Sequence, residues 1–246
     1  MNHKKLSLAL AAVLFALPLT AFAQEEAAAE EAVAEEEASI FSWNAALSSD
    51  YVFRGVSQND ERPTLQLGAD LNFDNGFYVG VWGSNVDFGT GGPDLELDTY
   101  LGWNVDLSDS WNLDLMLTRY NYIGEQDSYG DIDYNEFIGA LAWNEMVTFT
   151  LGYTNDIYNT GEDSFYYALG GSWDIGGGVG LGVGFGHTTF DSATGYRDYN
   201  DYSVSVNRDF GPVNAALGFY GTDRNGEINF GEVADNRLVL TFSIGG

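Results

Sequence analysis

The feature that most constrains this chain is residues 64–85, where apolar and polar residues alternate on both sides of a turn motif. The apolar positions are Leu65, Leu67, Ala69, Leu71 and Phe73 before the turn and Phe77, Val79 and Val81 after it. A period of two places them on one face of a strand. Between them, Asp74-Asn75-Gly76 supplies residues that accept the positive φ of a tight turn. The stretch predicts a β-hairpin with arms of about ten residues, enough to cross a bilayer as tilted strands.

Segments of this kind recur from Ile40 to the end of the chain, where Gly, Tyr, Phe, Asn and Asp dominate. We count twelve, at about 42–53, 64–73, 77–86, 95–105, 111–122, 134–143, 147–154, 164–173, 179–188, 199–208, 213–220 and 236–244. Short turns and long connections alternate between them, as in barrels with short periplasmic turns and longer outer loops. The sequence therefore predicts an all-β fold for residues 40–246: a transmembrane, antiparallel, up-and-down β-barrel of about twelve strands.

Tryptophan placement supports the membrane assignment. With this topology, Trp43, Trp103, Trp111, Trp143 and Trp173 all fall at strand ends beside the short turns. Indole combines an apolar body with a polar N–H group, so a ring of such residues at one level predicts an interfacial aromatic girdle. A soluble β-sandwich is the alternative, but it has no reason to sort its tryptophans by turn length.

The N-terminus is typical of an exported protein. Residues 1–23 combine Lys4 and Lys5, an apolar run and an Ala21-Phe22-Ala23 cleavage motif, which predicts a secretory signal peptide. Residues 24–39 are rich in Ala and Glu and have no apolar face, so we expect a flexible acidic tail. The sequence has no cysteine, which excludes a lipoprotein anchor and disulfides. We expect the mature chain in the outer membrane of a Gram-negative bacterium.

Charge restricts the partners. Removing residues 1–23 takes away two lysines and no acid, which changes the formal charge from −28 to −30. Such a chain would repel nucleic-acid phosphate, so we expect no nucleic-acid partner. The acidic balance suits cations or divalent ions. Loop acids at Glu125, Asp127, Asp131 and Asp133 suggest diffuse divalent-ion binding that bridges lipopolysaccharide.

Three short stretches carry a family resemblance. They are SSDYVFRGVSQ at residues 48–58, PTLQ at 63–66 and GVWGSNV at 80–86. Together they resemble the TorF-like (Gcw_chp) porin family of Gram-negative envelope proteins, whose functions are mostly unassigned. The resemblance implies an outer-membrane barrel. One departure from such barrels in general is the end of the chain, where Phe242 is followed by Ser-Ile-Gly-Gly instead of closing the sequence.

Alternation also predicts the residues that face the lumen. We expect the pore lining to include Asp50, Arg54, Asp70, Glu96, Asp98, Asp114, Glu136 and Arg237. Arg54 and Arg237 fall on the first and last predicted strands, which become neighbours when the barrel closes. An excess of acids over arginines would favour cations. In the alternative reading, acids and arginines neutralise each other in a plugged interior.

Other candidate chemistry has simpler explanations. Tyr78, Trp82, Tyr100, Tyr120, Tyr122 and Tyr166 also alternate inward, where they either fill space or stack sugars or nucleosides. Residues 221–232 have partial calcium-loop spacing, but an Asn-Gly turn explains them better. His187 is the only histidine outside the signal peptide and lacks a clear serine partner, so we expect no catalytic residues, cofactor or bound metal.

The sequence therefore predicts a passive, cation-preferring porin or ion channel for small hydrophilic solutes. Its other partners are outer-membrane lipid and lipopolysaccharide. The alternative function is a closed barrel that acts as an envelope scaffold or binds partners through its loops. An outer-membrane enzyme is a third and more distant possibility. The sequence gives no indication of oligomeric state.

Overall fold

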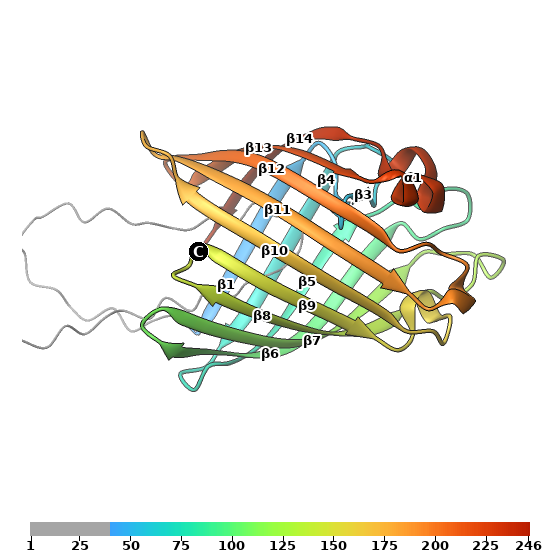
Figure 1. The fold of residues 1–246 in the computed structure, drawn as a ribbon, viewed down its shortest axis with the longest axis horizontal. Coiled ribbons are helices and arrows are strands. Elements are labelled where there is room, and N and C mark those ends of the chain that lie inside the picture. Colours follow the sequence, from blue (N-terminus) through green and yellow to red (C-terminus); the bar gives the residue numbers. More distant parts are fainter. Residues whose placement is uncertain (1–39) are drawn as a thin grey trace, which may run out of the picture.

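Twelve antiparallel strands close into a single barrel in the computed structural model, which describes residues 40–246 (Figure 1). The expected signal peptide and acidic tail, 1–23 and 24–39, lie outside these residues. The wall strands are β1 (Phe41–Ser48), β4 (Thr64–Asn72), β5 (Phe77–Asn85), β6 (Leu95–Ser108), β7 (Trp111–Ile123), β8 (Tyr134–Trp143), β9 (Val147–Thr154), β10 (Ser164–Asp174), β11 (Val179–Phe190), β12 (Tyr199–Phe210), β13 (Val213–Thr222) and β14 (Arg237–Gly245). The predicted fold is confirmed.

Closure joins the first wall strand to the last. β1 pairs with β4 on one edge and with β14 on the other, with Leu47 opposite Phe242. The hydroxyl oxygens of Ser48 and Thr241 lie 2.7 Å apart across this seam, on the inner face. At the other end of the seam the amide of Trp43 donates to the carbonyl of Gly246 at 2.8 Å. The described chain therefore begins and ends at the same rim.

That rim, which we call the turn end, carries the short connections at residues 73–76, 109–110, 144–146, 175–178 and 211–212. The opposite rim, the loop end, carries the long ones at 49–63, 86–94, 124–133, 155–163, 191–198 and 223–236. Figure 1 shows the helix α1 (Arg224–Phe230) at the loop end. The short 3-10 helices η1 (Ile157–Asn159), η2 (Ser192–Thr194) and η3 (Gly231–Ala234) lie in the long connections. The predicted alternation of short and long connections is confirmed.

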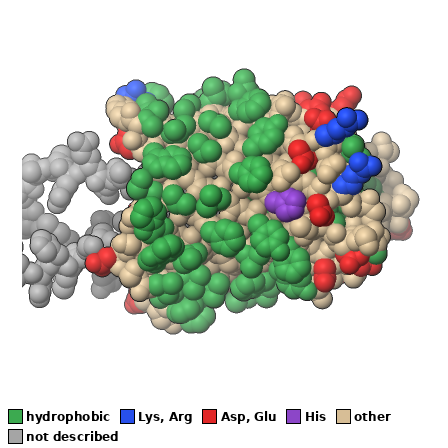
Figure 2. All heavy atoms as spheres, in the orientation of Figure 1, with side chains coloured by type: hydrophobic (Ala, Val, Ile, Leu, Met, Phe, Trp, Pro, Cys, Tyr) green, Lys and Arg blue, Asp and Glu red, His purple; other side chains and the backbone are tan. Residues whose placement is uncertain are grey.

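The barrel is apolar outside and polar inside. Leu65 and Leu67 are each 53% exposed, whereas the intervening Gln66 is 4% exposed. Figure 2 shows hydrophobic side chains over the strand wall, with charged side chains gathered towards the loop end. Among residues 40–246 no helix is long and apolar enough to cross a membrane.

The predicted girdle tryptophans are exposed or half-buried on the outside of the wall, near the turn end. Trp111 pairs directly with Trp143 across β7 and β8, and Trp103 pairs with Phe77 across β5 and β6. Trp43 and Trp173 are 41% and 36% exposed, whereas Trp82 is buried in the interior. Their contact with an interface between lipid and water stays a prediction.

Two local predictions were wrong. The Asn225-Gly226 pair does not form a turn but lies in the first turn of α1, because the Asp223 carboxylate caps that helix by accepting from both amides. The first strand was predicted to run to residue 53, but β1 ends at Ser48. The chain then forms a separate hairpin of β2 (Val52–Phe53) and β3 (Val56–Ser57), turned by positive φ values of 48° at Arg54 and 81° at Gly55. We call residues 49–63 the inserted hairpin.

The exposed apolar wall gives a direct test of membrane orientation. Val204 lies midway along β12 and is 49% exposed, whereas its neighbour Ser203 faces inward and is half-buried. Val204→Arg should destabilise the barrel folded in lipid vesicles by about 2–4 kcal/mol, because an arginine near the bilayer centre is poorly solvated. Reversible urea unfolding would measure the change. Ser203→Arg is the matched control, and an equal cost for both variants would contradict the assigned faces.

Candidate functional site

The inserted hairpin folds into the barrel and crosses its lumen near the loop end. Its base is held by the amide of Gln58, which donates to the carbonyl of Tyr51 at 2.7 Å. The Ser57 hydroxyl donates to Asp50 at 2.7 Å. Its tip reaches the far wall, where a Cβ added at Gly55 would lie 2.7 Å from the carbonyl oxygen of Gly221 on β13. Only glycine combines this closeness with the positive φ, so Gly55 lets the hairpin span the lumen.

Arg54 at this tip makes contacts with three strands of the barrel wall. Its guanidinium donates to both carboxylate oxygens of Glu136 on β8, at 2.7 and 2.8 Å. The same group lies over the ring of Tyr166, 4.1 Å from the ring centre. The Tyr199 hydroxyl donates to the Arg54 carbonyl at 3.1 Å. Gly152 makes room for the ion pair, because a Cβ there would lie 2.8 Å from Glu136.

A second ion pair ties the base of the hairpin to the closing strand. Arg237 on β14 donates to Asp50 at 3.1 Å, and both side chains are more than nine-tenths buried. Burial raises the pKa of Asp50, while the hydrogen bond from Ser57 and the contact with Arg237 act in the opposite direction. The prediction that the two arginines sit on the first and last strands was wrong for Arg54, which lies on the inserted hairpin.

The inward carboxylates and the inward tyrosines form hydrogen-bonded pairs. The phenols of Tyr78, Tyr100 and Tyr120 donate to Asp114, Asp70 and Glu136 at 2.8, 2.6 and 2.9 Å. From the inserted hairpin, Tyr51 donates to Glu96 at 3.0 Å. The sequence analysis treated these acids and aromatic residues as separate systems. In the structure the phenols of Tyr51, Tyr78 and Tyr100 satisfy acids that have no ion pair, whereas Tyr120 adds to the ion pair between Glu136 and Arg54.

Asp98 is the exception among the predicted lining acids. It is fully buried, and within residues 40–246 neither of its carboxylate oxygens accepts a hydrogen bond from a donor group; its interacting neighbour is another acid, Glu96. Glu96 lies two residues away on the same face of β6, and its Oε2 also lacks a partner. Two adjacent carboxyl groups with unsatisfied oxygens are costly to bury.

The interior is asymmetric. Against β4–β8 it is filled by a cluster of Tyr51, Tyr78, Trp82, Val86, Tyr100, Met116 and Ile138. A second cluster of Tyr120, Tyr122, Tyr134 and Ile157 continues it. On β10–β12, several inward positions carry small residues that are only half-buried, including Gly170, Gly184 and Ser203. The remaining space therefore lies along β10–β12.

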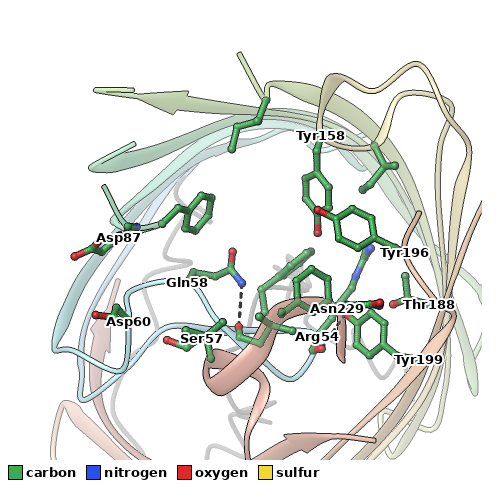
Figure 3. Close-up of a pocket in the computed structure, with 18 of the residues that line it drawn as sticks. Arg54, Ser57, Gln58, Asp60, Asp87, Tyr158, Thr188, Tyr196, Tyr199 and Asn229 are labelled. Atoms are coloured by element: carbon green, nitrogen blue, oxygen red, sulfur yellow. Dashed lines mark hydrogen bonds between the residues drawn. The ribbon is translucent and has the colours of Figure 1, made fainter. Parts of the chain in front are cut away.

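Two cavities flank the tip of the hairpin, and both are lined by Phe53 and Arg54. The outer vestibule, about 490 Å³, opens among the long loops, and Figure 3 shows Arg54 beside Thr188 and Tyr199 there. The inner cavity, about 200 Å³, touches β9 to β13, including Thr150, Gly184 and Ser203. Arg54 is the one predicted lining residue that contacts either cavity. The other predicted lining residues contact neither cavity.

Sequence reasoning missed the loop residues that line the vestibule. Phe88, Tyr129, Tyr158, Phe190, Tyr196 and Phe230 lie in long connections or at strand ends. The alternation of apolar and polar residues shows which face of a strand a side chain lies on, but it gives no such information for side chains in connections. The available signal was the density of aromatic residues in connections that are otherwise polar.

Residues 32–241 match the family described as "Bacterial protein of unknown function (Gcw_chp)", and the chain belongs to that family. No curated protein matches the sequence.

Solved structures with a similar fold include an outer-membrane porin. A structure described as the NanC porin in a rhombohedral crystal form aligns with a TM-score of 0.52 at 10% identity, covering 83% of this chain and 97% of that one. A structure from work on in-meso crystallisation of membrane proteins aligns with a TM-score of 0.53 at 10% identity, covering 84% and 83%. At such low identity these similarities establish the porin-like barrel fold and nothing about solutes.

His187, weighed for a catalytic role, points away from the lumen. It lies on the half-buried outer face of β11, where its Nδ1 is 2.9 Å from the side-chain oxygen of Asn200. Among residues 40–246, no three His, Cys, Asp or Glu side chains are arranged to hold a metal ion.

Neutralising Glu136, which is paired with Arg54, and neutralising Asp98, which is not in an ion pair, should have different effects on the free energy of unfolding. Glu136→Gln breaks a buried ion pair and leaves Arg54 without a counter-charge, so it should lower the free energy of unfolding by about 3–5 kcal/mol. Asp98→Asn removes a carboxyl group that is buried beside another acid, Glu96, and should leave stability unchanged or raise it. Urea unfolding in lipid vesicles would measure both. Equal destabilisation by the two variants would contradict the assigned environments.

Proposed function

We propose that this chain is an outer-membrane channel for passive diffusion of small hydrophilic solutes, with a preference for cations. The observation that carries the proposal is the inserted hairpin, which narrows the lumen but leaves a cavity on each side of its tip. The inner cavity is lined in part by the small residues Gly184 and Ser203, which leave space beside Arg54. The porin-like fold supports this reading.

The preference for cations follows from how the interior charges are paired. Arg54 and Arg237 neutralise Glu136 and Asp50. Asp70, Glu96 and Asp114 are paired with phenols, which donate hydrogen bonds but carry no positive charge. Asp98 lies against another acid, Glu96, and forms no ion pair within residues 40–246. A net negative field therefore remains around the path and would favour cations over anions.

Location and lipid partners belong to the same proposal. In this proposal residues 1–23 act as the export signal, and the apolar wall supports a location in the bacterial outer membrane. Near the loop end, Arg119 and Asp133 form an ion pair at 3.1 Å on the outside of the wall. Polar groups at this level suit lipopolysaccharide head groups.

A closed barrel that serves as a scaffold or loop-mediated binder is the second candidate. It is favoured by the burial of Asp50, Asp70, Glu96, Asp114 and Glu136, none of which contacts either cavity. Planar-bilayer recording with refolded protein separates the two candidates. Discrete conductance steps support the channel, whereas no conductance from protein shown to be folded supports the closed barrel.

Ion selectivity tests the acidic interior. Glu96→Gln combined with Asp98→Asn should shift the reversal potential in a salt gradient towards that of a non-selective pore, because it removes the negative charge that this pair of acids carries in the interior. Asp174→Asn, at an exposed position near the turn end, is the matched control and should have no effect. Unaltered selectivity in the double variant would reject a role of these acids in the pore.

The constriction itself is testable. Arg54→Ser combined with Glu136→Gln removes the ion pair at the hairpin tip without leaving either charge unpaired, and it should raise the single-channel conductance. Glu136→Gln alone controls for loss of the acid. A conductance of the double variant equal to that of the unmodified protein would show that the hairpin tip does not limit the path.

A further inference from the structure

The outer vestibule has the composition of a binding site for an organic ring. Phe53, Tyr158, Phe190, Tyr196, Tyr199 and Phe230 contribute rings to its lining. They come from the inserted hairpin, from η1, from the connection 191–198 and the two strand ends that it joins, and from α1. Tyr196 lies among them, with ring centres 5.2 Å from Phe190, 5.5 Å from Phe230 and 6.2 Å from Tyr158. Figure 3 shows Tyr158, Tyr196 and Tyr199 together on one side of the cavity.

Backbone strain supports a specific role for this arrangement. Tyr158 and Asn159 have φ values of 52° and 57°, a conformation that side chains other than glycine rarely adopt. The Tyr158 ring lies between Tyr134, at 5.6 Å, and Tyr196. The strained connection thus holds an aromatic ring at the cavity wall, as expected where strain is retained for binding.

The charges of the lining are already satisfied within the protein. Arg54 is paired with Glu136, and the carboxylates of Asp60 and Asp87 both bind Arg62 at 2.6 Å. Most neutral polar side chains of the lining are also occupied. Ser57 donates to Asp50, and the side chain of Asn229 is bonded to the backbone of Arg197. The hydroxyl of Thr188 is buried, which leaves the side-chain oxygen of Gln58 as a polar group that a ligand could reach. Such a lining disfavours a charged ligand and offers too few polar partners for a sugar with many hydroxyls.

We propose that the vestibule binds an uncharged planar aromatic solute of one or two rings that carries one or two hydroxyl or amide groups. Stacking on Tyr196 and Phe230 would supply the affinity, and the side-chain oxygen of Gln58 would accept a hydrogen bond from the polar group. The volume of about 490 Å³ accommodates such a molecule. The proposal rests on the proposed channel for the transport of that solute, but the binding site itself does not require conduction.

Binding of nicotinamide, a neutral aromatic amide, tests the site in full-length protein folded in lipid nanodiscs. Titration calorimetry should give saturable binding, and Tyr196→Ala should weaken it roughly tenfold because one stacking face is lost. Tyr196→Phe should retain affinity. Tyr167→Ala, on the outer face of β10, is the matched control and should change nothing. The heat-dependent gel mobility of each variant would show that the barrel is intact.

Two probes define the chemical class. Nicotinate, which has the same ring with a negative charge, and glucose, which has no aromatic face, should both bind at least tenfold more weakly than nicotinamide. Equal binding of glucose or nicotinate, no saturable binding of nicotinamide, or full affinity in Tyr196→Ala would each overturn the proposal. Bilayer recording then separates the two proposals, since binding without conductance overturns only the channel, and conductance without binding overturns only this site.

Discussion

The closed ladder of backbone hydrogen bonds is the constraint on which the rest of the structure depends. A strand in lipid has no water to satisfy its amides and carbonyls, so each wall strand must pair along both edges. The pairing of β1 with β14 meets this requirement and sets the register that places Ser48 beside Thr241 inside the barrel. Once the ladder is closed, the alternation of side chains fixes an apolar exterior and a polar interior.

A polar interior of this size creates a second requirement, which is to satisfy or solvate its buried groups. The structure does this by pairing phenols with carboxylates on one side and by inserting a hairpin that brings Arg54 to Glu136. The two solutions are linked, because Tyr51 of the hairpin also donates to Glu96. The filled half of the lumen is therefore held by polar pairs embedded among aromatic rings.

The asymmetry of the interior connects this packing to function. Large aromatic residues fill the β4–β8 side and the hairpin crosses to the opposite wall, so the residual space lies beside the hairpin tip, partly along glycine and serine positions of β10–β12. Phe53 and Arg54 border both cavities, so the hairpin meets that space through these two side chains. The packing therefore concentrates the remaining space on one side of a porin-like barrel.

The sequence by itself determined the barrel, its strand number, the outward face and the alternation of short and long connections. These depend on residue periodicity and turn chemistry, which are local. It also identified which residues alternate inward, but only the tertiary structure decided what they do. Alternation at residues 48–53 predicted that the wall strand continues. Instead, Asp50, Tyr51 and Arg54 leave the wall, because each forms a hydrogen bond with a residue on another strand. Their partners are Arg237, Glu96 and Glu136, respectively. The aromatic vestibule was likewise decided by the meeting of distant loops, and no local pattern encodes such a meeting.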